Sequence, residues 1–240
     1  MFNGLWNEME KQLVEGGKAF ISVTGGGGKT SFLIAFSSYL KSRGYSVLLS
    51  TSTKLAPPWK VDYKADMVFL KEDVMNYFPK KGETVFYAHY DEEKGKVVSP
   101  EESVVALLKP RYDVVIVEAD GSRNLPFKIH TSRDPVIWKD TTKVVAICGM
   151  WGLGKRTGEV SFGEETDSVV DRDYLLSYIS SEEGLSKGMD GHKAIYLFNG
   201  AEVMGTEERK VFLSLPIAEG RKGFLVNLRE GKIYEKKKKM

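Results

Sequence analysis

The sequence has little of what marks several common classes of protein. Its 240 residues include one cysteine, Cys148, so an intramolecular disulfide cannot form and a reducing compartment suits the chain. The three histidines are not spaced as metal ligands, so the sequence indicates no zinc site. No apolar run approaches membrane-spanning length, and the N-terminus lacks the basic and then apolar layout of a signal peptide. We therefore expect a soluble, cytoplasmic protein with no membrane partner.

The chain also lacks a strong excess of either charge. It has 35 basic and 33 acidic residues, a net charge of +2, so we expect no nucleic-acid partner. Much of the excess lies in the lysine run 236–239, which we expect to be a solvated, frayed end. There is no internal repeat or convincing linker, and 42% of the residues are hydrophobic. We expect residues 1–240 to form a single domain with a substantial core.

A glycine-rich loop between a strand and a helix organises what is present. The apolar run 19–23 predicts a buried strand, four glycines and Lys29-Thr30 follow, and apolar periodicity over 32–40 predicts a helix. This is the layout of a phosphate-binding loop, in which glycine amides approach phosphate oxygens and the helix N-terminus faces the same anion. We expect Lys29 to bridge the terminal phosphates of ATP or GTP, and the Thr30 hydroxyl to ligate Mg²⁺. The expected nucleotide-binding residues are Thr24, Gly25, Gly26, Gly27, Gly28, Lys29, Thr30 and Ser31.

The loop departs from the commonest pattern at one position. The pattern G-x-x-x-x-G-K-[ST] requires glycine where this chain has Val23. The remaining Thr-Gly-Gly-Gly-Gly-Lys-Thr resembles the T-G-x-x-G-K-T loop of Mur-type peptide ligases. A Mur-like ATP-dependent ligase is therefore an alternative, although 240 residues are few for the additional domains of such ligases. The other alternative is a glycine-rich turn that contains Gly-Lys-Thr by chance.

A second informative stretch ends in two acidic residues. The apolar run 114–117 predicts a strand buried on both faces, and Glu118 and Asp120 follow at its end. Residues two apart in an extended segment point to the same side. We expect Thr30 and Asp120 to hold magnesium and Glu118 to position the nucleophile, with Lys29, Glu118 and Asp120 as the catalytic residues. The alternative is an acidic turn after a core strand.

Other polar residues follow predicted strands and are candidates for a second substrate. Thr51, Thr53 and Lys54 come after the strand predicted over 45–49, where α/β sheets bind ligands. Arg123 and Lys128 follow the acidic pair and could clamp an anionic substrate. The alternatives are a polar strand exit for the first group and a solvated loop for the second.

The remaining patterns complete a fold prediction. Asn199 ends the strand predicted over 194–198, at the place where GTP-binding proteins read guanine, so it could contact a base or be an ordinary turn residue. The other predicted helices are 2–15, 100–108, 166–179 and 207–213, with a short helix near 72–77. The other predicted strands are 66–70, 84–90 and 144–149, with a C-terminal hairpin over 224–235. Together they predict a three-layer α/β domain of the P-loop NTPase type with a mostly parallel central sheet.

Four motifs occur together in one order. They are Val-Thr-Gly-Gly-Gly-Gly-Lys-Thr at 23–30, Ser-Thr-Ser-Thr-Lys at 50–54, Val-Glu-Ala-Asp-Gly-Ser-Arg at 117–123 and Asp-Pro-Val-Ile at 134–137. From about residue 19 to about 199 the chain resembles the YqeC family, accessory proteins of selenium-dependent molybdenum hydroxylases. The chain departs from that family at Ser50 and Ser52, where threonines are usual, and at Asp134, where glutamate is usual.

The resemblance implies a role in maturation of a selenium-dependent molybdenum hydroxylase or its cofactor. It implies a nucleotide-binding factor with the hydroxylase or its molybdenum or selenium cofactor as partner, rather than a particular reaction. From the glycine-rich loop and the acidic pair we expect an NTPase, or a phosphoryl or nucleotidyl transferase. The alternative is a chaperone-like partner that is gated by nucleotide and has negligible turnover. The sequence leaves ATP or GTP open, and also whether the chain forms a homodimer.

Overall fold

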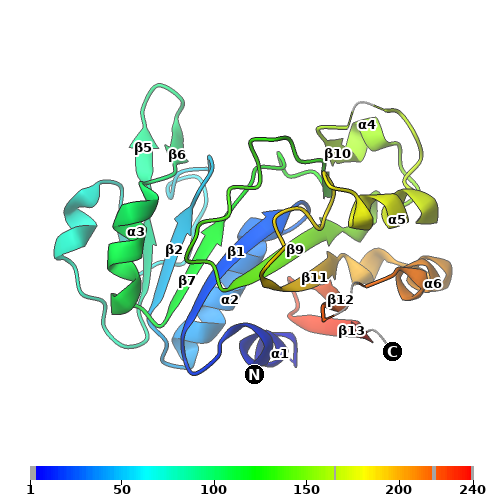
Figure 1. The fold of residues 1–240 in the computed structure, drawn as a ribbon. Helices are drawn as coiled ribbons and strands as arrows, with labels where there is room; N and C mark the ends of the chain where they lie inside the picture. Colours follow the sequence, from blue (N-terminus) through cyan, green and yellow to red (C-terminus); the bar gives the residue numbers. More distant parts are fainter. Residues whose placement is uncertain (1–3, 165, 218–219, 239–240) are drawn as a thin grey trace.

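A large, mostly parallel β-sheet forms the centre of the computed structural model, which describes residues 4–164, 166–217 and 220–238 (Figure 1). All neighbouring strands of this sheet run parallel except β13, which pairs with β12 in the opposite direction. In spatial order the nine strands are β13 (Lys232–Lys238), β12 (Lys222–Asn227), β11 (Lys193–Asn199), β9 (Lys143–Gly149), β1 (Ala19–Gly25), β7 (Val114–Glu118), β2 (Val47–Thr51), β4 (Thr84–Tyr87) and β3 (Met67–Phe69). The predicted α/β class with a mostly parallel sheet is confirmed.

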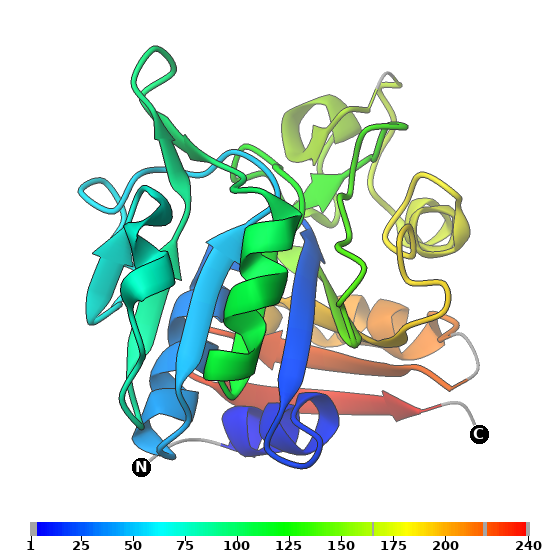
Figure 2. The same ribbon diagram turned by 60° about the vertical axis from the view of Figure 1, so that its left-hand side comes forward.

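Helices cover both faces of this sheet. α1 (Gly4–Leu13) and α2 (Lys29–Ser42) pack on one face, and α3 (Glu102–Leu108), α5 (Arg172–Ser180) and α6 (Thr206–Ser214) pack on the other. Figure 2 shows α3 in front of the sheet and α2 behind it. The strands alternate accordingly: Val145 and Ile147 of β9 face α2, while Val144, Ala146 and Cys148 face the α5 side. Cys148 is a fully buried core thiol.

Shorter elements lie between the main ones. The hairpin of β5 (His89–Asp91) and β6 (Lys96–Val98) projects at the upper left of Figure 1. β8 (Phe127–Lys128) and β10 (Ser161–Phe162) form a small parallel sheet. The other short elements are η1 (Glu72–Asn76), η2 (Lys109–Arg111), η3 (Met150–Gly152), α4 (Thr157–Val160) and η4 (Ala201–Val203).

Three predicted elements differ from those observed. The helix predicted over 166–179 begins only at Arg172, because Asp171 caps it by accepting from the Tyr174 amide and the preceding residues pair with the 155–157 segment. The strand predicted over 84–90 breaks into β4 and β5. The lysine run predicted to fray continues β13 as far as Lys238, while residue 239 lies outside the described residues. The first helix is confirmed over 4–13, and residues 2–3 of that prediction lie outside the described residues.

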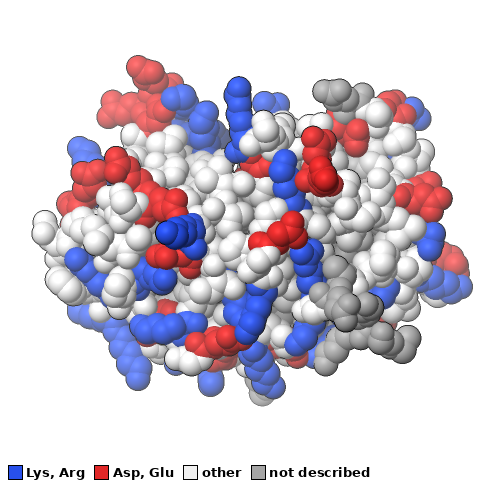
Figure 3. Space-filling model, viewed as in Figure 1, with Lys and Arg blue, Asp and Glu red and all other residues white. Residues whose placement is uncertain are grey.

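The surface gives two further observations. None of the helices within the described ranges combines the length and hydrophobicity needed to cross a membrane. On the face shown in Figure 3, basic and acidic side chains are interspersed, and this face carries no continuous basic field.

The order of the strands brings two loops together at one edge of the sheet. β1 lies between β7 and β9, and Val23 of β1 is in register with Glu118 of β7. The chain passes from β1 through α2 to β2 beyond β7, and from β7 to β9 beyond β1. The carboxyl ends of β1 and β7 therefore lie side by side, at the edge where open α/β sheets bind ligands.

Candidate functional site

The glycine loop after β1 is pressed against its neighbours. Gly25 and Gly27 have φ angles of +93° and +67°, a region that favours glycine. A Cβ at Gly25 would lie 2.1 Å from the Ile147 carbonyl oxygen, and a Cβ at Gly27 would lie 2.5 Å from the Gly149 nitrogen. Neither position has room for a side chain, so the loop needs glycine both for its backbone shape and for its close approach to the end of β9.

The loop amides are used differently from the expectation. The amides of Gly26 and Gly27 donate to the carbonyl oxygens of Ile147 and Leu125, at 2.8 and 2.9 Å, rather than pointing into an open cradle. The Gly25 amide donates to Asp120 Oδ2 at 2.7 Å. These contacts fix the shape of the loop and leave anion binding to the start of α2.

The N-terminus of α2 has the features of an anion site. The helix begins at Lys29, and its N-cap is Gly28, which provides no capping side chain. The first amides of a helix have no intrahelical acceptor and carry a partial positive charge. The first turn of α2 also contains no acidic residue that would compete with an anion. Phosphate oxygens are the ligands that such a helix start binds well.

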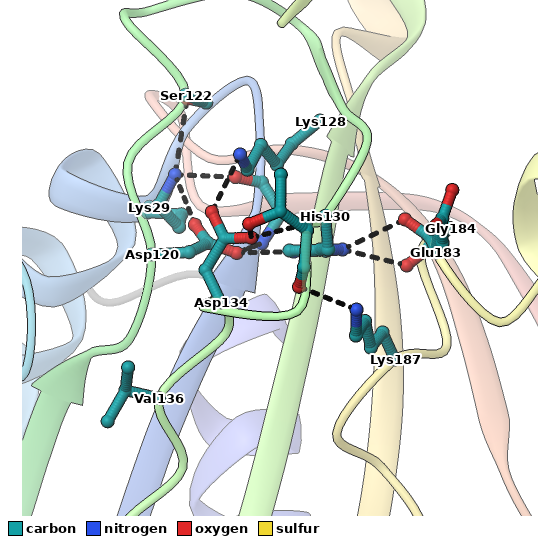
Figure 4. A network of polar contacts seen from close by, with 12 residues as sticks. Lys29, Asp120, Ser122, Lys128, His130, Asp134, Val136, Glu183, Gly184 and Lys187 are labelled. Carbon is teal, nitrogen blue, oxygen red and sulfur yellow. Dashed lines mark hydrogen bonds and ion pairs between the residues drawn. The ribbon is translucent and has the colours of Figure 1, made fainter. Parts of the chain in front are cut away.

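Lys29 is the centre of a buried polar cluster at this point. Its side chain is 3% exposed, and its Nζ lies 3.0 Å from Asp120 Oδ1 and 4.0 Å from Glu118 Oε1. Nζ also donates to the Gly25 carbonyl oxygen at 2.5 Å and to Ser122 Oγ at 3.2 Å. Figure 4 shows the Lys29 ammonium directed at Asp120 and Ser122. The structure thus brings together the lysine and both acids that the sequence singled out.

Glu118 is the acid closest to the helix. Ile116 packs on the α2 face of the sheet, so Glu118, two residues later, reaches the same side. Its Oε2 accepts a hydrogen bond from the Thr30 hydroxyl at 2.9 Å. Burial raises the pKa of Glu118 to about 7, and the Lys29 charge and the Thr30 hydrogen bond offset only part of this increase.

Asp120 has the opposite electrostatic character. Its Oδ2 lies 2.6 Å from His130 Nε2 and accepts from the Gly25 amide, while its Oδ1 faces Lys29. Burial alone would raise its pKa, but Lys29 and the His130 hydrogen bond together hold the pKa of Asp120 below its ordinary value. Two carboxylates two residues apart therefore differ: the pKa of Asp120 is lowered beside Lys29 and His130, whereas Glu118 is about half protonated at pH 7.

The contacts favour Thr30 with Glu118, rather than the expected Thr30 with Asp120, as the two protein ligands of a Mg²⁺ ion. Thr30 contacts Glu118, whereas Asp120 is committed to Lys29, His130 and Gly25. Within the described part of the chain, no three His, Cys, Asp or Glu residues are grouped as a metal site. Mg²⁺ is commonly held by one or two protein ligands together with substrate phosphates. The Thr30 hydroxyl and the Glu118 carboxylate fit that requirement.

The residues expected to bind a second substrate differ in how far they are exposed. Thr51 is buried, donates to the Glu118 carbonyl oxygen at 3.1 Å and accepts from the Thr53 amide at 3.0 Å, so it holds β2 against β7. Thr53 is half-buried, and Lys54 is exposed beyond the end of the strand. Of these three, Lys54 has the exposure that a ligand contact requires.

Arg123 and Lys128 lie against the same aromatic ring. Their charged groups are 4.7 and 4.5 Å from the centre of the Phe162 ring. Lys128 is buried, and its Nζ lies 2.7 Å from Asp134 Oδ2, so its charge is already compensated. Arg123 is exposed and follows Ser122 of the Lys29 cluster, which makes it the accessible cation of the pair.

Asn199 supports the loop. Its Nδ2 donates to the Gly27 carbonyl oxygen at 2.9 Å, and its Oδ1 accepts from the Leu228 amide at 3.0 Å. Both ends of the amide are therefore occupied by the protein, which opposes the expected contact with a base. Thr24 lies in β1, and its buried hydroxyl has no hydrogen-bond partner among the described residues. Ser31 is exposed in the first turn of α2.

Sequence reasoning missed His130. This residue is 1% exposed and contacts Asp120, but it lies in a loop ten residues further along the chain. No periodicity or metal-ligand spacing marks it. The only available signal was that His130 follows the acidic pair by ten residues.

A cavity of about 530 Å³ lies elsewhere, between the N-terminus of α5 and α6. Val169, Val170, Arg172, Lys210 and Val211 are among its lining residues, and no residue of the glycine loop is. We place the candidate site at the loop despite this cavity, because the buried lysine, the two acids and the uncapped helix meet there.

Comparisons with known proteins identify the family of the chain. The family model described as "YqeC protein" matches residues 21–163, which include the glycine loop, both acids and His130. "Uncharacterized protein YqeC" of Escherichia coli (strain K12) is 33% identical, and the alignment covers 75% of this chain and 75% of that protein. No solved structure matches the chain. The family model covers more than half of the chain, and the relative is similar over most of its length; the chain belongs to the YqeC family.

Proposed function

We propose that this protein binds ATP or GTP with Mg²⁺ at the N-terminus of α2 and couples the nucleotide to maturation of a selenium-dependent molybdenum hydroxylase or its cofactor. The observation that carries the nucleotide part is the uncapped start of α2 beside buried Lys29 and the Thr30–Glu118 pair. The maturation part rests on the resemblance to the YqeC family.

The chain's own residues divide the work as follows. The first amides of α2 bind phosphate oxygens, and Lys29 neutralises the charge of the terminal phosphates. Thr30 and Glu118 hold magnesium, which supplies further charge neutralisation when bound. Asp120, ionised between Lys29 and His130, orients the lysine. Arg123 lies at the edge of the cluster, where its exposed guanidinium meets an anionic second substrate.

One observation favours a second candidate, a nucleotide-gated binding partner with slow turnover. Lys29 is held by Gly25, Asp120 and Ser122, so phosphate must displace at least one of these contacts before the ammonium can bind it. Breaking a buried ion pair opposes binding, and the same rearrangement moves the 120–123 segment. Nucleotide would then act by changing the shape of the loop.

Equilibrium titration with ATP and GTP, in magnesium and in EDTA, followed by phosphate release, tests the proposal. Magnesium-dependent saturable binding with release of phosphate supports the NTPase or transferase. Binding without release supports the gated partner. Glu118→Gln keeps the shape of the side chain but removes its charge, so it should bind nucleotide with little dependence on magnesium. The absence of binding by the unmodified chain would refute the proposed function.

A further inference from the structure

His130 is held from two sides. On one side its Nε2 lies 2.6 Å from Asp120 Oδ2. On the other its Nδ1 lies 2.9 Å from the Gly184 carbonyl oxygen, and its backbone amide donates to the Glu183 carbonyl oxygen at 2.7 Å. A ring protonated on both nitrogens donates to Asp120 and to Gly184 at once. Figure 4 shows the ring lying between Asp120 and the 183–184 turn.

The same oxygen of Asp120 receives two donors. Oδ2 accepts from His130 and from the Gly25 amide, which leaves Oδ1 to face Lys29 at 3.0 Å. Since the carboxylate is planar, fixing Oδ2 also fixes the direction of Oδ1. The position of the Lys29 ammonium and the path of the loop at Gly25 therefore both depend on the His130 contact. His130 itself does not contact Lys29 in any of the hydrogen bonds or ion pairs described above.

We propose that His130 is a positioning residue of the nucleotide site, which acts through Asp120 and transmits the position of the 183–184 turn to Lys29. This inference rests on the proposed function for its link to nucleotide, but the His130–Asp120–Gly25 arrangement exists without it. The 183–184 turn is anchored to the end of α5, because the Gly184 amide donates to the Ser181 carbonyl oxygen at 3.1 Å and the Leu185 amide donates to the Tyr178 carbonyl oxygen at 2.8 Å. The support of the loop thus extends from β1 to the segment between α5 and β11.

Two substitutions separate the two sides of the ring. Glutamine places an amide nitrogen near the position of Nε2 and can still donate to Asp120. Asparagine places one near Nδ1 and can donate only toward Gly184. We expect His130→Asn to weaken binding of magnesium ATP by about tenfold or more, as for loss of a hydrogen bond to a charged group. His130→Gln should stay within about threefold of the unmodified protein.

A second readout requires no nucleotide. Hydrogen exchange of the Gly25 amide in the unliganded protein should be at least about tenfold faster in His130→Asn and near normal in His130→Gln. The Val145 amide, in the middle of β9, is the internal control, because general destabilisation would accelerate both amides. Asp120→Asn provides a background in which His130→Asn should make no further difference.

The outcomes distinguish the two proposals. If magnesium ATP affinity and protection of the Gly25 amide are lost in His130→Asn but kept in His130→Gln, the positioning role is supported. Equal behaviour of the two variants at Gly25, or a change that Val145 shares, overturns it. If the unmodified protein binds no nucleotide, the proposed function fails, and Gly25 exchange alone still decides whether His130 orients Asp120.

Discussion

Two buried lysines invite comparison, Lys29 in the glycine loop cluster and Lys128 in β8. Both side chains are 2–3% exposed, and both pair with an aspartate, at 3.0 Å for Lys29–Asp120 and 2.7 Å for Lys128–Asp134. The Lys128 pair is closed, because one ammonium meets one carboxylate, and the ammonium also lies over the ring of Phe162. The Lys29 cluster has a second carboxylate, Glu118, and lies at a helix start with no capping side chain.

The difference shows which features distinguish the proposed binding site. Burial and ion pairing occur in both regions, so neither feature is sufficient. The Lys29 cluster alone combines a carboxylate with a raised pKa, a glycine loop and the positive end of a helix. We base the proposed binding of an anion with a divalent cation on this combination.

Replacing each lysine by alanine tests this comparison, and it should give the largest changes in stability and in nucleotide affinity. Lys29→Ala and Lys128→Ala each leave a buried or half-buried carboxylate without its partner, so each should lower the free energy of unfolding by about 3–5 kcal/mol. Only Lys29→Ala should abolish tight nucleotide binding, and Lys128→Ala should bind within about threefold of the unmodified protein. Denaturant unfolding and calorimetry measure the two quantities. Micromolar affinity in Lys29→Ala, or equal loss of affinity in both variants, would overturn the assignment.

Glu118 gives a pH dependence of stability that is opposite in direction to that of Asp120. Because its folded pKa is about 7 against an ordinary 4.5, the folded protein retains a proton that the unfolded chain releases between these values. The associated stability is complete below about pH 4.5 and is lost as the pH rises through 7, a change of about 3 kcal/mol. Asp120, with a lowered pKa, acts in the opposite direction and only below about pH 4.

Glu118→Gln is the control for this prediction. The amide does not titrate, so the free energy of unfolding of this variant, measured without magnesium, should change less between pH 4.5 and 7.5 than that of the unmodified protein. Parallel curves for the two proteins would contradict the raised pKa.

Asn199 sharpens the comparison by testing what supports the loop. Asn199→Ala removes the contacts to Gly27 and Leu228 and should cost about 1–2 kcal/mol of stability. Because the amide is committed to the protein, affinity for ATP and for GTP should fall by the same factor. Competition binding with the two nucleotides measures this, and a selective loss of one of them would restore Asn199 as a base contact.

Arg123 is expected to give the smallest change. It contacts the same ring as Lys128, but it is exposed, and an exposed cation–π contact contributes about 0.5–1 kcal/mol. Arg123→Ala should therefore destabilise the fold by less than about 1 kcal/mol, far less than Lys128→Ala. Denaturant unfolding of the two variants side by side tests this, and similar losses would show that the Lys128–Asp134 pair contributes no more stability than the ring contact of Arg123.

Local patterns predicted much of the fold and the centre of the site. Apolar periodicity located β1, α2 and β7 because each buries a regular face. Residue spacing placed Glu118 and Asp120 on one side, and the register of β1 with β7 brought both to Lys29. Side chains two residues apart point to the same side wherever the backbone is extended, so this part of the site could be predicted from the sequence.

The contacts of the site that the sequence could not predict depend on the conformation of loops. The His130–Asp120 and Lys128–Asp134 contacts arise from the path of the 122–138 segment, which no periodicity encodes. Thr30 donates to Glu118 rather than to Asp120, because Asp120 already accepts a hydrogen bond from the loop amide of Gly25. The start of α5 was detectable in principle, because Asp171 is a strong N-cap residue.

The most direct test of the central claim is a map of backbone amide chemical shifts while magnesium ATP or magnesium GTP is added. If the start of α2 binds the phosphates, the amides of Gly28, Lys29, Thr30 and Ser31 should show the largest changes, and Val169 and Val211 at the α5–α6 cavity should show none. Changes centred on that cavity, or no changes with either nucleotide, would contradict the account.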